Sequence, residues 1–261
     1  MMIKTTLQGG LIYLTMVFFV ATLVASVRRQ RVLIKGFWAA GFLTAVSAVV
    51  WRGIHTGHPP MQNLFEFFLC MAAFLWPLSQ LSQRKNGIDT TVKDALLGLC
   101  ILFPAGFIFG EEVRRLPPAL QSSLFIPHVA SYVAGYIMLA RAALMALPMF
   151  KRECPPVALR SAEAASRQTV VVGFLLITSG LILGSLWGKI CWGHYWQWDP
   201  KEMWSLATWM VYGSYLHLRL KTGMRQPRLL AAFLWIGLLF VVLTLTWINL
   251  SRLFSGMHNY A

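Results

Sequence analysis

A dense group of aromatic side chains, here called the tryptophan segment (residues 187–204), has the composition of a ligand site. Its first twelve residues hold four indole rings, those of Trp187, Trp192, Trp196 and Trp198. Trp and Tyr often anchor proteins at the depth of lipid headgroups, but four indoles so close together exceed what anchoring requires. Flat indole faces suit a flat, apolar and polarisable ligand. The segment therefore predicts such a site, and the ligand that fits this chemistry best is a porphyrin.

Two histidines elsewhere in the chain have side chains that could ligate the iron of that porphyrin. His128 stands at the start of an apolar stretch, and His258 lies in the C-terminal tail. Neutral imidazoles that approach a macrocycle from opposite faces supply both axial ligands of haem iron. The alternative for each residue is a hydrogen-bonded histidine at a membrane boundary. How the chain crosses the membrane decides whether the two can meet.

The composition identifies the elements that must position these residues as membrane helices. The chain has 261 residues, of which 57% are hydrophobic and 12% charged, which excludes an ordinary soluble domain. Windows of about 20 residues predict an all-α integral membrane protein, a single polytopic domain over residues 1–261 with the tryptophan segment as an outer loop. The eight predicted spans are 8–27, 33–51, 64–82, 94–110, 126–148, 170–187, 202–220 and 229–250, and residues 149–168 are predicted to be a connecting loop.

The formal charge of +14 is distributed unevenly over the predicted loops. The loops after the first, third, fifth and seventh predicted helices carry fifteen of the 23 lysines and arginines. By the positive-inside rule, both termini and the tryptophan segment face the periplasm or lumen. His128 and His258 are then on the same side as the four tryptophans, which favours ligation over a boundary role. This distribution makes nucleic acid an improbable partner, and the membrane lipid a certain one.

Two further residues, His217 and His58, differ in predicted depth. His217 follows the seventh span toward the inner side, where it is either a functional site within the membrane or a helix-end histidine that caps carbonyl groups. His58 belongs to an outer loop. Its two alternative roles are to form hydrogen bonds within that loop or to line a haem path. A bilayer about 30 Å thick separates the two, so they make a poor ligand pair. A second ligand for an inner haem would come from a partner subunit.

The motifs resemble the WWD signature of the haem-handling proteins of cytochrome c biogenesis. The resemblance covers most of the chain, and with eight helices it is closest to the CcsA (ResC) type of system II. The residues that carry it are the runs 192–202 (WGHYWQWDPKE), 57–66 (GHPPMQNLFE) and 255–260 (SGMHNY), together with the surroundings of His128 and His217. Phe65 stands where the family usually has tyrosine.

The resemblance implies a role, a cofactor and partners. Such proteins, together with a CcsB (ResB)-type membrane subunit, move haem b across the membrane and present it to the Cys-x-x-Cys-His motif of apocytochrome c. By this resemblance His128 and His258 ligate the outer haem, while Trp187, Trp192, Trp196, Trp198 and Asp199 form its surroundings. His217 ligates haem in transit. Asp199 is expected to cap the next helix or hold the loop rather than contact iron. His55, His194 and Cys191 match no signature position and receive no role.

Three other readings stay open from the sequence. One is a CcmC-like haem exporter that delivers haem without forming a thioether bond. Another is a HemX-like regulatory membrane protein, and the third is an electron-transfer cytochrome with permanently bound haem. The preferred reading is the haem-handling subunit of a cytochrome c synthase in a bacterial cytoplasmic membrane, with no catalytic residue of its own assigned.

Overall fold

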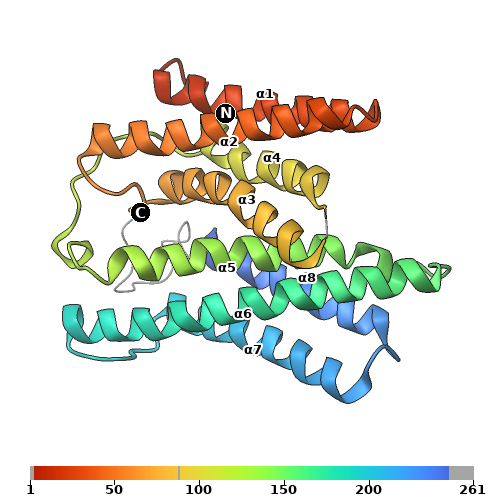
Figure 1. Ribbon diagram of the computed structural model, residues 1–261. Helices are drawn as coiled ribbons and strands as arrows, with labels where there is room; N and C mark the ends of the chain where they lie inside the picture. Colours follow the sequence, from red (N-terminus) through yellow and green to blue (C-terminus); the bar gives the residue numbers. More distant parts are fainter. Residues whose placement is uncertain (1–2, 88, 247–261) are drawn as a thin grey trace. The chain divides into compact units, whose positions relative to one another are not determined.

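Long apolar stretches form α-helices in the computed structural model, which describes residues 3–246 except Ile88 (Figure 1). The described residues form ten helices: α1 (Leu7–Val27), α2 (Arg31–Thr56), α3 (Leu64–Asn86), α4 (Thr91–Phe107), the 3-10 helix η1 (Pro118–Leu120), α5 (Phe125–Met145), the 3-10 helix η2 (Leu147–Phe150), α6 (Pro156–Trp192), α7 (Pro200–Thr222) and α8 (Pro227–Leu245). The prediction of an all-helical chain is confirmed for these residues.

The chain divides into two compact units, Met1–Gln121 and Ser122–Ala261. In the first unit each of α1 to α4 contacts the helix before and after it, and contacts between α1 and α4 close the ring. The helices α5 to α8 of the second unit form a ring in the same way, closed by α5 and α8. Short connections between successive helices make both units antiparallel four-helix bundles. The single polytopic domain over residues 1–261 stays a prediction. The structure divides this range into two helical bundles.

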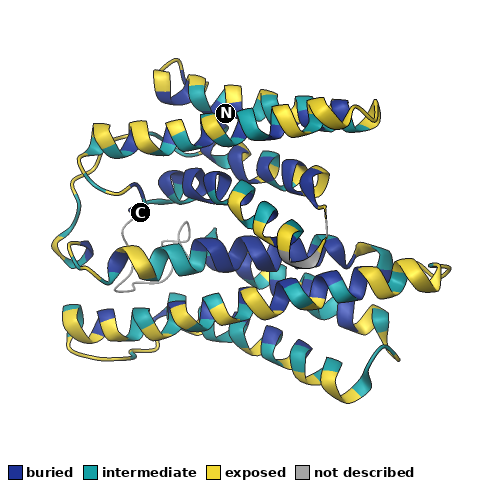
Figure 2. Ribbon diagram, in the orientation of Figure 1, coloured by how far each residue is buried: buried dark blue, intermediate teal, exposed yellow. Residues whose placement is uncertain are grey.

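Six of the eight predicted spans have the length and composition of a membrane helix: α1, α2, α3, α5, α6 and α8. The other two are helices as predicted. However, α4 has only 17 residues, and α7 carries charged side chains in its first and last turns. Figure 2 shows exposed positions along the helices of both bundles. Many of the exposed residues are large and apolar, as expected for surfaces that face lipid. The chain is a multi-pass integral membrane protein.

The predicted connecting loop over residues 149–168 is wrong for most of its length. Helix α6 begins at Pro156 and continues for 37 residues, about 55 Å at 1.5 Å per residue. Apolar windows detect only the part that lies in hydrocarbon, and the first turns of α6 carry Arg160, Glu163 and Arg167. Glu163 forms ion pairs with Arg167 and with Arg219 of α7, which stabilise this polar extension.

Helix direction defines two ends of the second unit. One end, here called the tryptophan end, holds the starts of α5 and α7, the end of α6 and residues 193–199. The opposite end, here called the basic end, holds residues 146–155 and 223–226. The helices α5 and α6 approach closely between these ends, because Gly135 and Gly173 lie where a Cβ atom would be 2.7–2.8 Å from Ile177 and Leu139. Small residues commonly permit such close contact between membrane helices.

Candidate functional site

His128 lies in the first turn of α5, at the tryptophan end. Its Nδ1 is 2.9 Å from the carbonyl oxygen of Gly180 in α6. A carbonyl oxygen only accepts hydrogen bonds, so Nδ1 carries the proton and, in the neutral ring, the lone pair lies on Nε2. A hydrogen bond of this kind fixes both the tautomer and the orientation of metal-binding histidines. The arrangement therefore leaves on Nε2 the lone pair that a metal-binding imidazole needs.

Two glycines of α6 make room for this ring. A Cβ atom on Gly184 would be 2.5 Å from Cε1 and 2.9 Å from Nδ1 of His128. A Cβ atom on Gly180 would be 2.8 Å from the ring of Tyr132, which meets the ring of His128 edge-on with centroids 5.2 Å apart. Any larger residue at either position would displace the imidazole or its neighbour. These glycines position His128 without touching a ligand.

One of the predicted tryptophans, Trp187, packs beside His128, and a second, Trp192, packs against Trp187. The ring of Trp187 lies 5.5 Å from the His128 ring and 5.3 Å from the ring of Trp192, between centroids. Trp187 is only 2% exposed and also contacts Phe125. Both tryptophans belong to the last turns of α6 rather than to a loop. Trp187 is therefore a fixed wall of the site.

The loop between α6 and α7 contains only residues 193–199. It begins where Gly193, with φ of 84°, ends α6 in the left-handed conformation that favours glycine. It ends at Asp199, which caps α7 by accepting a hydrogen bond from the backbone N–H of Lys201. Glu202 completes a capping box, since its Oε2 accepts from the N–H groups of Asp199 and Gln197. The expectation that Asp199 caps a helix is confirmed.

The other two predicted tryptophans belong to this loop and contact each other edge-on, with centroids 6.0 Å apart. Trp198 is 66% exposed and has a φ of 59°, which turns the chain just before the cap. Trp196 has a buried Nε1 that has no hydrogen-bond partner among the described residues. The loop thus offers an open aromatic surface and one unsatisfied donor.

Lys201 is the titratable cation nearest to the loop cap. It lies in the first turn of α7, and burial lowers its pKa from 10.5 to about 8, while the charge of Asp199 acts in the opposite direction. A lysine with this pKa changes charge just above neutral pH.

The remaining predicted residues do not join this group. His217 lies near the far end of α7 with an exposed side chain, and no hydrogen bond or ion pair within the described part of the chain involves it. His194 is exposed in the loop, and Cys191 is a partly buried cysteine in the last turn of α6. His258 lies outside the described residues, so its predicted place beside His128 stays a prediction.

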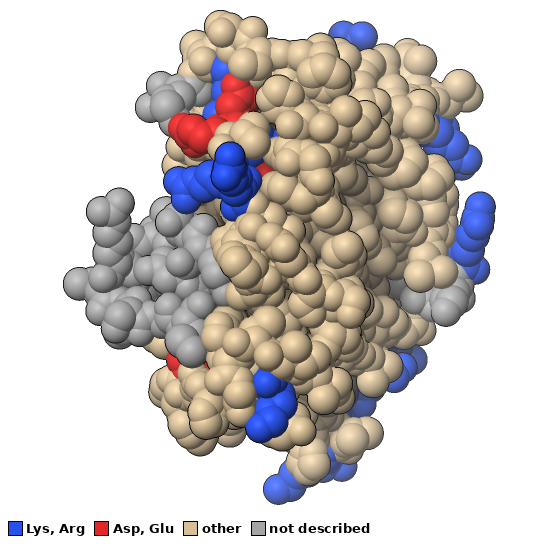
Figure 3. Space-filling view, turned by 90° about the vertical axis from the view of Figure 1, so that its left-hand side faces the viewer, with Lys and Arg blue, Asp and Glu red and all other residues tan. Residues whose placement is uncertain are grey.

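His58 belongs to the first unit, where it bonds the loop that follows α2. Its Nδ1 is 3.0 Å from the carbonyl oxygen of Pro59 and its Nε2 is 3.4 Å from that of Arg114. Near this loop the buried Arg52 pairs with Glu66 at 3.0 Å and donates to the carbonyl oxygens of residues 111 and 112. Figure 3 shows acidic and basic side chains side by side in the upper part of that view of the molecule. These contacts favour the loop-bonding role, and a role in a haem path stays a prediction.

Sequence reasoning missed the residues that hold His128 in place. Gly180, Gly184 and Gly188 recur every fourth residue, so they form one stripe along α6. Such a Gly-x-x-x-Gly pattern predicts close helix contact in membranes. This pattern could have indicated from the sequence that another helix packs against these glycines. Gly188 serves the loop, because a Cβ atom there would be 3.2 Å from the carbonyl oxygen of His194.

Comparison with known proteins gives the chain its relatives. Residues 61–258 match the model of the family described as cytochrome C assembly protein. The cytochrome c biogenesis protein CcsA of Parasynechococcus marenigrum (strain WH8102) is 32% identical over 84% of this chain and 83% of its own length. The protein of the same name from Synechococcus sp. (strain CC9605) is 30% identical over 97% of this chain and 94% of its own length.

A solved structure shares the fold. The cytochrome c haem lyase CcmF superposes with a TM-score of 0.67 over 94% of this chain at 17% identity, and the chain spans 48% of that structure. The likeness includes the residues of both helical bundles and concerns their fold alone. With the family match over most of its length, the chain belongs to the cytochrome c assembly protein family.

Proposed function

We propose that this chain handles haem b during cytochrome c maturation. It carries haem across the membrane and presents it at the tryptophan end of the second unit, with a CcsB (ResB)-type subunit as partner. The recipient is apocytochrome c with its Cys-x-x-Cys-His motif. Haem is the substrate of this process, and the family membership supports its involvement.

The observation that carries the proposal is the hydrogen bond from His128 Nδ1 to the carbonyl oxygen of Gly180. It directs the lone pair to Nε2, and the close contact with Gly184 holds the ring in one orientation. Trp187 covers one side of the imidazole. His258 is proposed as the second ligand.

The loop between α6 and α7 fits the edge of a haem that must be released. The buried Nε1 of Trp196 is a donor without a partner in the described part of the chain, and a propionate oxygen would satisfy it. The exposed Trp198 leaves the site accessible from outside. We infer a presentation surface rather than a closed storage pocket, which an incoming apocytochrome can reach.

His217 is proposed to ligate haem in transit. Its side chain is exposed, so a partner subunit can approach it and supply the second ligand. The alternative role, capping carbonyls at the end of α7, has no support from a hydrogen bond in the described residues.

The chain needs little acid or base chemistry for this role. The bound haem supplies its vinyl groups and iron, and the apocytochrome supplies the thiols that form the thioether bonds. The residues of this chain position the substrate and set the access of the incoming peptide, which is the usual contribution of a protein to cofactor chemistry.

The test is purification of the chain with its CcsB-type partner in wild-type, His128→Ala and His217→Ala forms, followed by absorption spectroscopy of reduced haem b. We expect His128→Ala to lower holocytochrome c formation at least about tenfold, because an iron ligand is lost. Added imidazole should restore part of it. His217→Ala should instead lower the haem content of the purified complex, whereas His194→Ala is the matched control with an exposed histidine in the loop.

Normal holocytochrome c levels in His128→Ala would remove the ligand assignment. The wild-type complex could instead bind haem normally but form no thioether bond in the reconstituted reaction. That result would favour the CcmC-like delivery role. Absence of haem b bands from the wild-type complex would contradict the proposal as a whole.

A further inference from the structure

The basic end of the second unit contains a cavity of about 450 Å³ that the haem site does not use. Its walls come from the connection between η2 and α6 and from the connection between α7 and α8. Both α6 and α8 contact η2, so the two walls belong to one packed structure. The side chains that line it include the cations Lys151, Arg152, Arg225 and Arg228.

The charge of this cavity is not balanced by the protein. Its lining contains four cations and no carboxylate, and the neighbouring Glu153 is exposed and does not belong to the lining. Among the described residues none of the four cations forms an ion pair. All four side chains are exposed, so solvent weakens their mutual repulsion, and an anion placed among them would reduce it further.

The backbone adds to the positive potential. Helix α8 begins at Pro227 beside the cavity, and the side chain of Gln226 does not cap it. The N–H groups of its first turn, including those of Arg228 and Leu229, therefore lack a capping side chain. The start of a helix carries a partial positive charge and free N–H donors, both of which favour an oxyanion such as phosphate.

The walls are apolar as well as basic, which indicates the kind of anion. Met149, Leu159 and Leu229 line the cavity among the cations. Phe150 and Val157, which are close in sequence to lining residues, are also exposed apolar side chains. A free phosphate ion has no use for these contacts, whereas a phospholipid offers a phosphate next to glycerol and acyl chains. Basic pockets between membrane helices commonly bind anionic headgroups.

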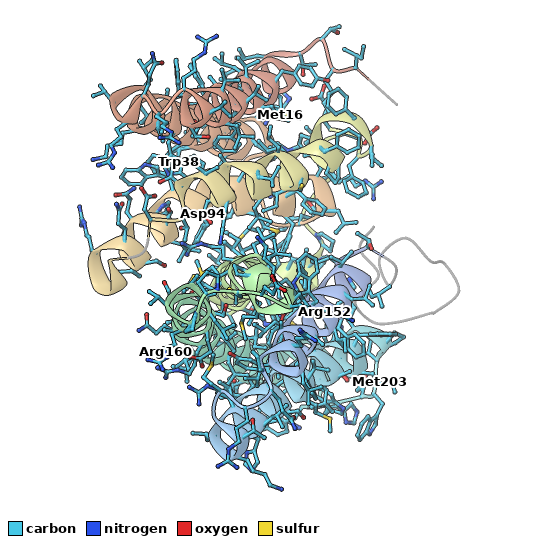
Figure 4. The ribbon with its side chains drawn as sticks, turned by 90° about the vertical axis from the view of Figure 1, so that its right-hand side faces the viewer. Met16, Trp38, Asp94, Arg152, Arg160 and Met203 are labelled. Atoms are coloured by element: carbon cyan, nitrogen blue, oxygen red, sulfur yellow. The ribbon has the colours of Figure 1, made fainter. Side chains whose placement is uncertain are left out.

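We propose that this cavity binds the headgroup of an anionic phospholipid from the leaflet at the basic end. The phosphodiester meets the four cations and the start of α8, and the glycerol backbone contacts the leucines. The site would join the α5–α6 and α7–α8 hairpins at the end opposite His128. Figure 4 views this end, and shows Arg152 near α8 and Arg160 on a different part of the unit.

The test measures the melting temperature of the purified full-length chain in neutral detergent with added dioleoyl phosphatidylglycerol. Dioleoyl phosphatidylcholine and inorganic phosphate serve as comparison ligands. We expect a saturable rise with phosphatidylglycerol, because a ligand that binds only the folded state stabilises it, and no rise with the other two. An equal rise in melting temperature with inorganic phosphate would show that the cavity binds a free anion. An equal rise with phosphatidylcholine would show that binding does not depend on the net negative charge of the headgroup. Either result overturns the proposal.

Variants locate the binding. Replacing two cations in Arg152→Gln/Arg225→Gln should weaken phosphatidylglycerol binding about 30-fold. The second pair, Lys151→Gln/Arg228→Gln, should do the same and covers the case in which the first does not fold. The control is Arg160→Gln, an exposed cation of α6 that does not line the cavity. Unchanged affinity in a folded pair would overturn the site. No residue of the proposed haem site lines the cavity, so this result is independent of the proposed haem function.

Discussion

Replacing Gly184 by alanine is the sharpest perturbation of the His128 site, because it changes neither a ligand nor a charge. The new Cβ atom would be 2.5 Å from Cε1 of His128, whereas ordinary contact begins near 3.4 Å. The ring must therefore move by about 0.9 Å, and its Nδ1 donates a 2.9 Å hydrogen bond to the carbonyl oxygen of Gly180. A shift of that size directed away from Gly180 lengthens this distance to about 3.8 Å, which is no longer a hydrogen bond.

The expected consequences can be given a size. Loss of the hydrogen bond costs about 0.5–1.5 kcal/mol, and overpacking of a close contact typically about 1–3 kcal/mol, so the protein should still insert and fold. Misplacing a ligating group by about 1 Å can reduce a positioned reaction about 100-fold. We therefore expect holocytochrome c formation to fall between about tenfold and 100-fold in Gly184→Ala while the amount of protein in the membrane changes little.

The assay is holocytochrome c formation, normalised to the amount of membrane-inserted chain. Gly213→Ala is the matched control, since a Cβ atom there would be 3.8 Å from Phe174, an ordinary contact in the same unit. The double variant Gly184→Ala/His128→Ala should be no worse than His128→Ala alone, because both changes act on one imidazole. Full activity of Gly184→Ala, or additive losses in the double variant, would refute the reasoning that this glycine works through His128.

Two further predictions concern the start of α7. Asp199→Ala should destabilise the chain by about 1 kcal/mol and lower holocytochrome c formation, whereas Asp199→Asn, which still offers a capping oxygen, should retain both; equal losses in thermal-shift and maturation assays would contradict the capping role. Because Lys201 loses its proton near pH 8 in the folded state but near 10.5 when unfolded, the unfolded state binds more protons between these values, and stability should rise with pH. Melting temperatures from pH 7.5 to 9.5 should show this rise relative to Lys201→Met, and parallel curves would disprove it.

Apolar windows predicted the existence of all eight α-helices but not the ends of the longest. The prediction for 8–27 agrees with α1 to within one residue at its start, because Thr6 caps that helix directly before the apolar run. For α6 the apolar window covered only about half of the helix. Its polar first turns are held by Glu163 and Arg219, which are 56 residues apart in the chain, and no local pattern reports such a contact.

The candidate site was partly predictable for a similar reason. The residue types of His128, Trp187 and Asp199 indicated what each side chain could do. In the structure His128 and Trp187 lie in contact, and Asp199 caps α7. The tryptophan segment was expected to be a loop throughout, but Trp187 and Trp192 continue α6 because nothing before Gly193 interrupts it. The sequence could not predict which ring nitrogen of His128 donates a hydrogen bond, because the acceptor is a carbonyl oxygen 52 residues away.

The contacts of α6 also measure how far apart the two proposed haem positions are. Gly184 marks the level of His128, and Glu163 marks the level of Arg219, two residues beyond His217. The 21 residues from 163 to 184 span about 31 Å of helix, close to the roughly 30 Å thickness of the hydrocarbon core. One haem therefore cannot reach His128 and His217 at the same time. Under the proposed function haem must leave one ligand set before it meets the other, so His217→Ala should deplete the outer site as well, whereas His128→Ala should leave the inner site filled.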